Sequence, residues 1–175
     1  LEDYLQTEWP ELDVYLTSVT DHYSTARICG PNSKKILKKL FPNKDFSDEA
    51  FPHMSYQDAI IDKVECRIMR ISFTGELSYE INVESKYGKS LWENCIEAGE
   101  EYKITPYGTE TMHLLRAEKG FIIVGQDTDG TMTPIDLQMD WIVSKKKYDF
   151  IGKRSLYRSD TTVSYTHLTL PTSSR

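Results

Sequence analysis

The segment RISFTGELSYEINV, from Arg70 to Val83, constrains the fold more than any other part of the chain. After Gly75, apolar and polar residues alternate strictly; the apolar set is Leu77, Tyr79, Ile81 and Val83, and the polar set is Glu76, Ser78, Glu80 and Asn82. Successive side chains of a strand point to opposite faces, so this alternation predicts a strand with one face in a core. We expect this strand to form a hairpin with Val64–Phe73, turning at Thr74-Gly75.

The remaining pattern mixes strands and helices without regular winding. Expected strands are Val14–Thr20, Thr25–Cys29 and a short buried or extended FIIVG segment at 121–125. A first helix is expected to start near Pro31, with Ile36, Leu37 and Leu40 at helical spacing. Further helices are expected at Lys86–Tyr102, at Thr109–Lys119 and from Pro134 towards Trp141. Ile142, Val143 and Phe150 are expected to close the core. This order predicts an α+β fold with mixed or antiparallel sheets and packed helices.

The length of 175 residues favours one domain, which we place at residues 1–160 as a partial domain. Residues 161–175, TTVSYTHLTLPTSSR, are more than half Ser and Thr and carry no acidic residue. We interpret this end as a non-native or disordered tail. The first residue is Leu and not Met, so we expect further sequence to precede it.

Composition narrows the classes of partner. The net charge of −6 does not favour nucleic acid, which needs a clustered basic surface, and the only basic run is Lys145-Lys146-Lys147. The three cysteines form no CxxC pair, which indicates neither a zinc ribbon nor a disulfide framework. No segment has the pattern of a signal peptide or a membrane span. A cytoplasmic protein that binds neither nucleic acid nor membrane is therefore expected.

No common catalytic or metal motif is present. The sequence contains no GxSxG, Walker loop, GxGxxG or HExxH. The DTDG stretch lacks the spacing of a calcium loop, and the histidines are scattered. We therefore assign no catalytic residue and no metal ligand.

Two charged residues stand out among apolar neighbours, namely Glu80 in the expected strand and Arg116 in MHLLRAEKG. Glu80 either faces solvent on the polar side of its strand or holds a ligand. Arg116 is a cation at a helix end stabilised by the helix dipole, one partner of an ion pair with Glu118 or Glu80, or a ligand contact. Periodicity does not choose between these alternatives.

Three spaced motifs resemble the folate-binding aminomethyltransferase family, which includes the glycine-cleavage T-protein and the carboxy-terminal part of the sarcosine oxidase alpha subunit. They are RISFTGELSYEI, LLRAEKGFIIVGQDTDGTMTP and VSKKKYDFIGKRSL, and the resemblance extends over about Leu12 to Asp160. The second motif is more similar to the sarcosine oxidase form than to the T-protein form. The resemblance implies the family's folate-binding domain, here as a fragment.

The same resemblance implies the site. The family's pterin-contacting Glu falls on Glu80, its folate-contacting Arg on Arg116, and its aromatic residue before Thr-Gly on Phe73, where the T-protein commonly has Tyr. A pterin presents two adjacent N–H donors that one carboxylate can accept as a fork, and an aromatic ring can stack on it. The implied ligand is tetrahydrofolate.

The resemblance also implies an activity for the parent enzyme, a hetero-oligomeric sarcosine oxidase whose FAD, FMN and NAD are bound outside this fragment. Sarcosine is oxidised at a flavin, and the folate domain captures the one-carbon unit as 5,10-methylenetetrahydrofolate. The isolated fragment is expected to be inactive. Alternatives are a T-protein, a dimethylglycine-oxidising relative and a non-catalytic folate-binding module; the last is disfavoured because the Lys-Gly-Cys-Tyr motif of such modules is absent.

Overall fold

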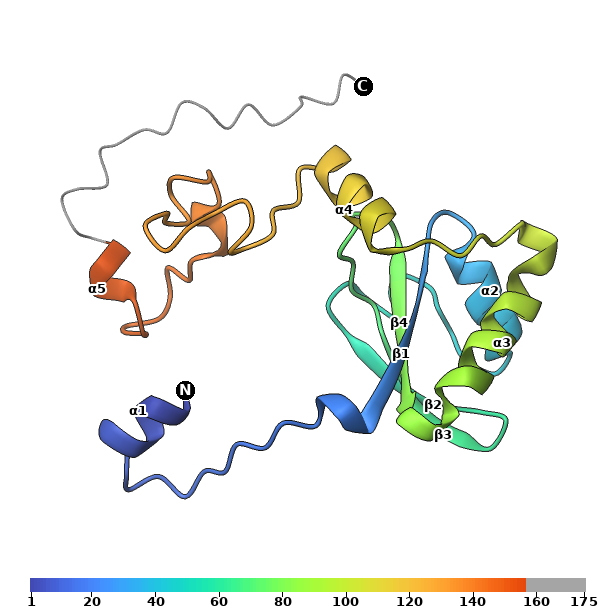
Figure 1. The fold of residues 1–175 in the computed structure, drawn as a ribbon, viewed down its shortest axis with the longest axis horizontal. Coiled ribbons are helices and arrows are strands. Elements are labelled where there is room, and N and C mark those ends of the chain that lie inside the picture. The colour runs from blue at the N-terminus through green and yellow to red at the C-terminus, as the bar shows by residue number, and fades with distance from the viewer. Residues whose placement is uncertain (157–175) are drawn as a thin grey trace. The chain divides into compact units, whose positions relative to one another are not determined.

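The computed structural model describes residues 1–156 (Figure 1). The chain divides into two compact units, Leu1–Pro106 (unit 1) and a second that begins at Tyr107 (unit 2). The expected tail at 161–175 and the expected boundary at 160 lie outside the described residues. No helix among the described residues is both long and apolar enough to cross a membrane.

Unit 1 is built on a four-stranded sheet in the order β1-β4-β3-β2. The strands are β1 (Tyr23–Cys29), β2 (Tyr56–Ile61), β3 (Val64–Met69) and β4 (Ser78–Glu84). All three neighbouring pairs are antiparallel. The last strand in sequence is therefore an interior strand, hydrogen-bonded to β1 on one side and to β3 on the other.

Two helices cover one face of this sheet, α2 (Ser33–Leu40) and α3 (Gly88–Gly99) (Figure 1). Short 3-10 turns, η1 (Thr20–His22), η2 (Ser85–Tyr87) and η3 (Glu100–Tyr102), flank β1 and α3. The core between sheet and helices includes Ile28, Leu37, Phe51, Ile68, Tyr79, Ile81, Val83, Leu91 and Cys95. Apolar residues alternate along the strands and recur at helical spacing in the helices, and burial of this shared apolar surface holds the layers together.

The predicted α+β fold is confirmed, because an antiparallel sheet packs against helices. The predicted pairing of the two strands around Gly75 is also confirmed, although the connection is an irregular loop over residues 70–77 and not a tight turn. Gly75 has φ of 78°, a conformation that residues with a Cβ rarely adopt. The turn was therefore predicted at the correct position, but the connection is longer than the predicted Thr74-Gly75 turn.

The strand predicted for Val14–Thr20 is wrong. This segment follows the short helix α1 (Glu2–Thr7) and has no strand partner; Tyr15 is 88% exposed. β-branched and aromatic residues favour a strand only where a neighbouring strand and a packed face are available. In contrast β2, which the sequence pattern did not predict, pairs with β3 over its whole length.

Unit 2 contains α4 (Thr109–Glu118), η4 (Asp140–Ile142) and α5 (Lys153–Leu156), joined by turns. The predicted helix at 109–119 is confirmed. The expected strand at 121–125 is reduced to a single bridge between Val124 and Thr128, and the segment after Pro134 forms turns before η4. The core role expected of Ile142 is wrong, because its side chain is 51% exposed.

Candidate functional site

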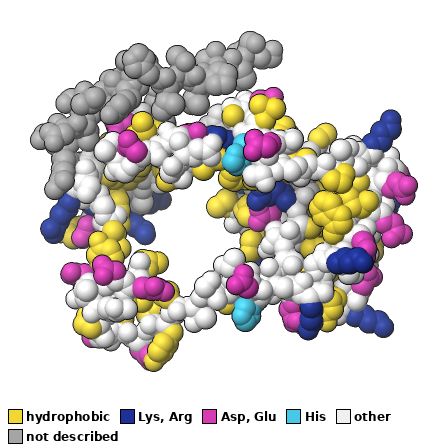
Figure 2. Space-filling model, viewed as in Figure 1, with side chains coloured by type: hydrophobic (Ala, Val, Ile, Leu, Met, Phe, Trp, Pro, Cys, Tyr) yellow, Lys and Arg dark blue, Asp and Glu magenta, His cyan; other side chains and the backbone are white. Residues whose placement is uncertain are grey.

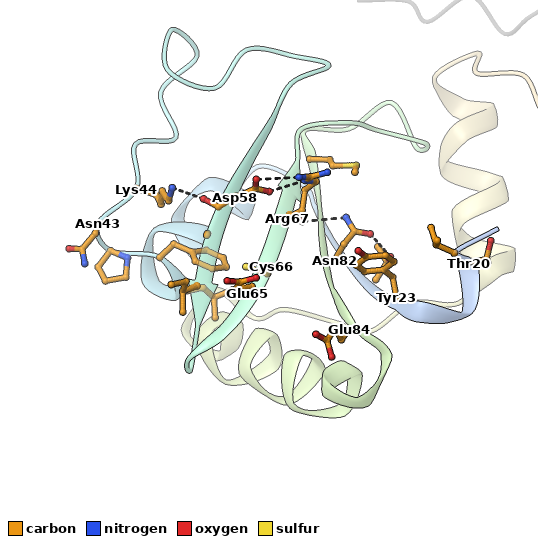
Figure 3. Close-up of a pocket in the computed structure, with 18 residues that line it drawn as sticks. Thr20, Tyr23, Asn43, Lys44, Asp58, Glu65, Cys66, Arg67, Asn82 and Glu84 are labelled. Atoms are coloured by element: carbon orange, nitrogen blue, oxygen red, sulfur yellow. Dashed lines mark hydrogen bonds and ion pairs between the residues drawn. The ribbon is translucent and has the colours of Figure 1, made fainter. Parts of the chain in front are cut away.

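The face of the sheet opposite α2 and α3, here called the open face, is polar. Along β4 its residues are the buried Ser78, the partly buried Glu80 and Asn82 and the exposed Glu84, which alternate with the core residues Tyr79, Ile81 and Val83. Cross-strand polar contacts link the open face. Thr25 donates to Asn82 over 2.6 Å, and Arg67 donates to both carboxylate oxygens of Asp58 over 2.8 and 3.2 Å (Figure 3).

Glu80 is paired with Arg27 of β1, which lies directly opposite it in the antiparallel register. The Nε atom of Arg27 donates to Oε1 of Glu80 over 2.9 Å, and Nη2 of Arg27 donates to the same oxygen. The Glu80 side chain is 14% exposed and that of Arg27 is 26% exposed. Both of these hydrogen bonds end on Oε1, so the second oxygen, Oε2, of this mostly buried carboxylate remains as an acceptor.

Phe73 lies in the loop between β3 and β4 and completes this group. The guanidinium carbon of Arg27 is 5.7 Å from the centroid of the Phe73 ring, within the range of a cation–π contact. The structure therefore brings Phe73 and Glu80 together through a third residue, Arg27. We call these three residues the Glu80 cluster.

Buried hydroxyl groups lie beside the Glu80 cluster in sequence. The side-chain oxygens of Ser72, Thr74 and Ser78 are shielded from solvent and have no hydrogen-bond partner among the described residues. Thr74 is fully buried and Ser78 is 2% exposed. Buried polar groups in proteins almost always find a partner, so these three hydroxyls, two in the loop and one at the start of β4, are unused hydrogen-bonding capacity close in sequence to Phe73 and Glu80.

A depression of about 1270 Å³ lies on unit 1, and Figure 3 draws the residues that line it. Its lining includes Thr25, Lys44, Asp58, Arg67, Met69 and Asn82. Met69 is the β3 residue opposite Glu80, yet neither Glu80 nor Phe73 lines the depression. The depression also reaches the buried residues Phe41, Ala59 and Cys66, so it is not confined to the open face and is a separate place from the Glu80 cluster.

Arg116 belongs to unit 2, in the last turn of α4, and is 8% exposed. Its guanidinium pairs with the carboxylate of Asp127, through Nη1 to Oδ2 and through Nη2 to Oδ1 at 3.3 Å. Nη1 also donates to the Phe121 carbonyl over 3.1 Å. The ion-pair alternative for Arg116 is thus realised within this unit, with Asp127 in place of the expected Glu118 or Glu80.

The environment of Asp127 favours its charged form. The hydrogen bond from Arg116 and the backbone N–H of Ile123, 2.8 Å from Oδ2, hold the pKa of the Asp127 carboxyl below its ordinary 3.8. Asp127 therefore remains ionised at neutral pH and fixes the turn that follows α4. Arg116 and Glu80, the two charged residues singled out by sequence, are each held by an opposite charge from their own unit.

Two of the three cysteines, Cys66 and Cys95, are buried and do not offer a nucleophile. Burial raises the pKa of the Cys66 thiol to about 11 and that of Cys95 to about 12, so both are protonated at neutral pH. Within residues 1–156, no three His, Cys, Asp or Glu side chains gather as metal ligands. The chemistry available on the open face is binding through hydrogen bonds, charge and an aromatic ring.

Sequence reasoning missed Arg27. An arginine within TARIC, a segment correctly predicted as strand, was itself a signal, because a charged residue between the apolar Ala26 and Ile28 must face away from the core. The missing step was the pairing of β1 with β4, which places residues 53 positions apart directly opposite each other. Register between distant strands is not encoded in local periodicity.

Comparison with known proteins identifies the family. The model of a family described as the GCVT N-terminal domain matches residues 1–147. The chain is 59% identical over 161 residues to the sarcosine oxidase subunit alpha of Corynebacterium sp. strain P-1, a match covering 91% of this chain and 16% of that protein. It is 57% identical over 161 residues to the same subunit of Corynebacterium sp. strain U-96, covering 91% and 17%.

A more distant relative carries a different name. The aminomethyltransferase of Chlorobium limicola is 34% identical over 142 residues, covering 81% of this chain and 39% of that protein. The chain therefore spans a small part of the length of the relatives that it matches.

Proposed function

Because the chain belongs to the family of the GCVT N-terminal domain, we propose that it is a folate-binding portion of a sarcosine oxidase alpha subunit. The observation that carries this proposal is the 59% identity to a sarcosine oxidase alpha subunit over 91% of the chain. Identity to the Chlorobium aminomethyltransferase is 34%, which makes the glycine-cleavage T-protein the second candidate. A dimethylglycine-oxidising relative ranks with it, at 31% identity to the mouse mitochondrial dimethylglycine dehydrogenase.

The Glu80 cluster supplies groups that fit a pterin. The ring presents two parallel N–H donors, and a carboxylate accepts such a pair as it accepts a guanidinium. Glu80 stands on an interior strand, mostly buried, with Oε2 available as an acceptor. Phe73 offers a ring face beside it for stacking. Arg116, on unit 2, is proposed on the resemblance alone as a contact for a folate carbonyl or carboxylate.

In the proposed reaction the parent enzyme oxidises sarcosine at a flavin, and the one-carbon unit at the imine level is captured by tetrahydrofolate as 5,10-methylenetetrahydrofolate. The residues of this chain contribute binding and orientation of the folate, which a reaction between an amine and an electrophilic one-carbon centre needs more than covalent catalysis. The FAD, FMN and NAD of the parent and the other subunits of the hetero-oligomer lie outside the proposed role of this chain.

The test is Glu80→Ala in the full-length protein that carries this segment. Tetrahydrofolate affinity, measured by anaerobic calorimetry, should fall by about 1–3 kcal/mol, or roughly 5- to 150-fold, because the pterin donors lose their acceptor. Flavin-dependent oxidation of sarcosine should persist, with formaldehyde as the released product.

Glu84→Ala is the matched control. Glu84 stands on the same strand and the same face but is exposed and pairs with Lys86. Its removal should leave folate affinity unchanged. Equal affinities for tetrahydrofolate in native protein and Glu80→Ala would remove Glu80 from the site.

A further inference from the structure

Arg27 already makes the two contacts that the proposed function assigns to the pterin. Its guanidinium donates from Nε and Nη2 to the Glu80 carboxylate, and the same group lies 5.7 Å from the centroid of the Phe73 ring. A guanidinium and the amino-pyrimidinone edge of a pterin share a planar N–C–N unit with N–H donors pointing the same way. Arg27 is thus a chemical counterpart of the ligand, supplied by the neighbouring strand.

The geometry at Glu80 does not allow both partners at once. Both Arg27 donors end on Oε1, and a carboxylate oxygen has two lone pairs, so Oε1 is saturated. Oε2 alone remains for another donor. A ligand that binds as a two-donor fork needs both oxygens, and it must therefore remove at least one Arg27 contact.

Of the two partners, Arg27 has the more exposed side chain. Glu80 is anchored on an interior strand with Arg27 opposite on one side and Met69 on the other. The Arg27 side chain is 26% exposed against 14% for Glu80, and its long flexible stem can carry the guanidinium into water. Displacement of the guanidinium breaks the ion pair with Glu80 and the contact with the Phe73 ring, while the backbone pairing of β1 with β4 stays in place.

We propose that Arg27 occupies the place of the pterin in the ligand-free protein, so that folate binding requires the Arg27 guanidinium to leave Glu80 and Phe73. This inference rests on the proposed function of the Glu80 cluster. Arg27 is an internal competitor, and the observed affinity is the intrinsic affinity reduced by the fraction of molecules in which Arg27 has swung away. The contact also keeps a mostly buried carboxylate paired until a ligand arrives.

The experiment is Arg27→Met in the full-length protein, titrated with tetrahydrofolate under anaerobic conditions. Methionine keeps an unbranched stem but removes the donors and the charge. We expect the dissociation constant to fall roughly fivefold, since a partly exposed ion pair and one ring contact no longer compete. If Arg27 instead supported the folate site, Arg27→Met would raise the dissociation constant. The direction of the change therefore distinguishes the two roles.

Arg67→Met is the matched control, because Arg67 stands on the same open face, pairs with Asp58 and lies 4.4 Å over the Tyr56 ring. It removes the same charge and the same kinds of contact without touching Glu80, and folate affinity should stay within twofold of native. Tightening of similar size in Arg67→Met would assign the effect to net charge and overturn the inference.

Arg27→Lys keeps the charge and offers one donor nitrogen, so its dissociation constant should lie between those of native protein and Arg27→Met. If Arg27→Met does not fold, the change in the dissociation constant of Arg27→Lys relative to native protein provides the test. Weaker or unchanged binding in these variants overturns the role of Arg27. Glu80→Ala in the same assay separates the two claims, because unchanged binding there contradicts the proposed site itself.

Discussion

The interactions that stabilise unit 1 internally differ from those within unit 2. Every buried hydrophobic residue in the described part of the chain belongs to unit 1, from Ala26 to Ala98. In unit 2, within residues 107–156, the only buried residues are Arg116 and Thr128. Hydrophobic side chains reach the surface in both units (Figure 2), and in unit 2 they include Val124 at 82% and Trp141 at 73% exposed.

This difference shows where the free energy of folding resides. Apolar burial is the main favourable contribution to folding, so unit 1 has its own source of stability. Unit 2 has local polar contacts instead, such as Arg116 with Asp127 and Thr133 with Asp136. We therefore expect unit 1 to resist perturbation as one cooperative unit and unit 2 to open locally.

The largest expected effect comes from Ile81→Ala in the centre of unit 1. Ile81 is fully buried between the sheet and the helices, and truncation should cost about 2–5 kcal/mol of the free energy of unfolding. Ile142→Ala in unit 2, at 51% exposed, should cost less than about 0.5 kcal/mol. Chemical denaturation of both variants measures the contrast, and equal costs would show that unit 2 buries Ile142 in solution.

An intermediate effect is expected at Asp127. Asp127→Asn removes the charge that holds the buried Arg116, and protection of the Ile123 amide against hydrogen exchange should fall by about 1 kcal/mol. The folded pKa of Asp127 lies below 3.8, so its contribution is complete above that value and is lost as pH falls through the folded pKa. In Asp127→Asn this acid dependence should disappear. Retention of the same acid profile would assign it to other carboxylates.

The smallest effect is expected from Tyr79→Phe in unit 1. Tyr79 is fully buried, and its hydroxyl has no hydrogen-bond partner among the described residues. Removal of an unpaired buried hydroxyl should leave the midpoint of thermal unfolding unchanged or raise it, by up to about 1 kcal/mol in stability. A clear loss of stability would indicate a partner for the hydroxyl, such as an internal water molecule.

The parts of the fold that sequence predicted are those with strong local periodicity. The alternation in β4 and the apolar spacing in α2, α3 and α4 identified these elements because each pattern repeats within a few residues. β2 was missed, since YQDAII exposes Ile60 and Tyr56 together with Asp58 and alternates weakly by residue type. Its place in the sheet is decided by pairing with β3, which is a tertiary effect.

Part of the candidate site could likewise be predicted from the sequence. Periodicity placed Glu80 on the face away from the core, and the resemblance proposed its ligand. Arg27 required the register of β1 against β4, and Asp127 required the turn after α4 that brings it back to Arg116. In both cases the partner of a charged residue is a property of the folded chain.

The contrasting backbone settings of Glu80 and Phe73 have a consequence for protein engineering. Glu80 stands on a strand that is hydrogen-bonded along both edges, whereas Phe73 stands in the irregular loop over residues 70–77. The carboxylate is therefore positioned by strand pairing, whereas the ring is positioned by a loop in which only Thr74 is fully buried. A library that diversifies this loop and leaves β4 untouched would explore new ring-shaped ligands around a fixed negative charge.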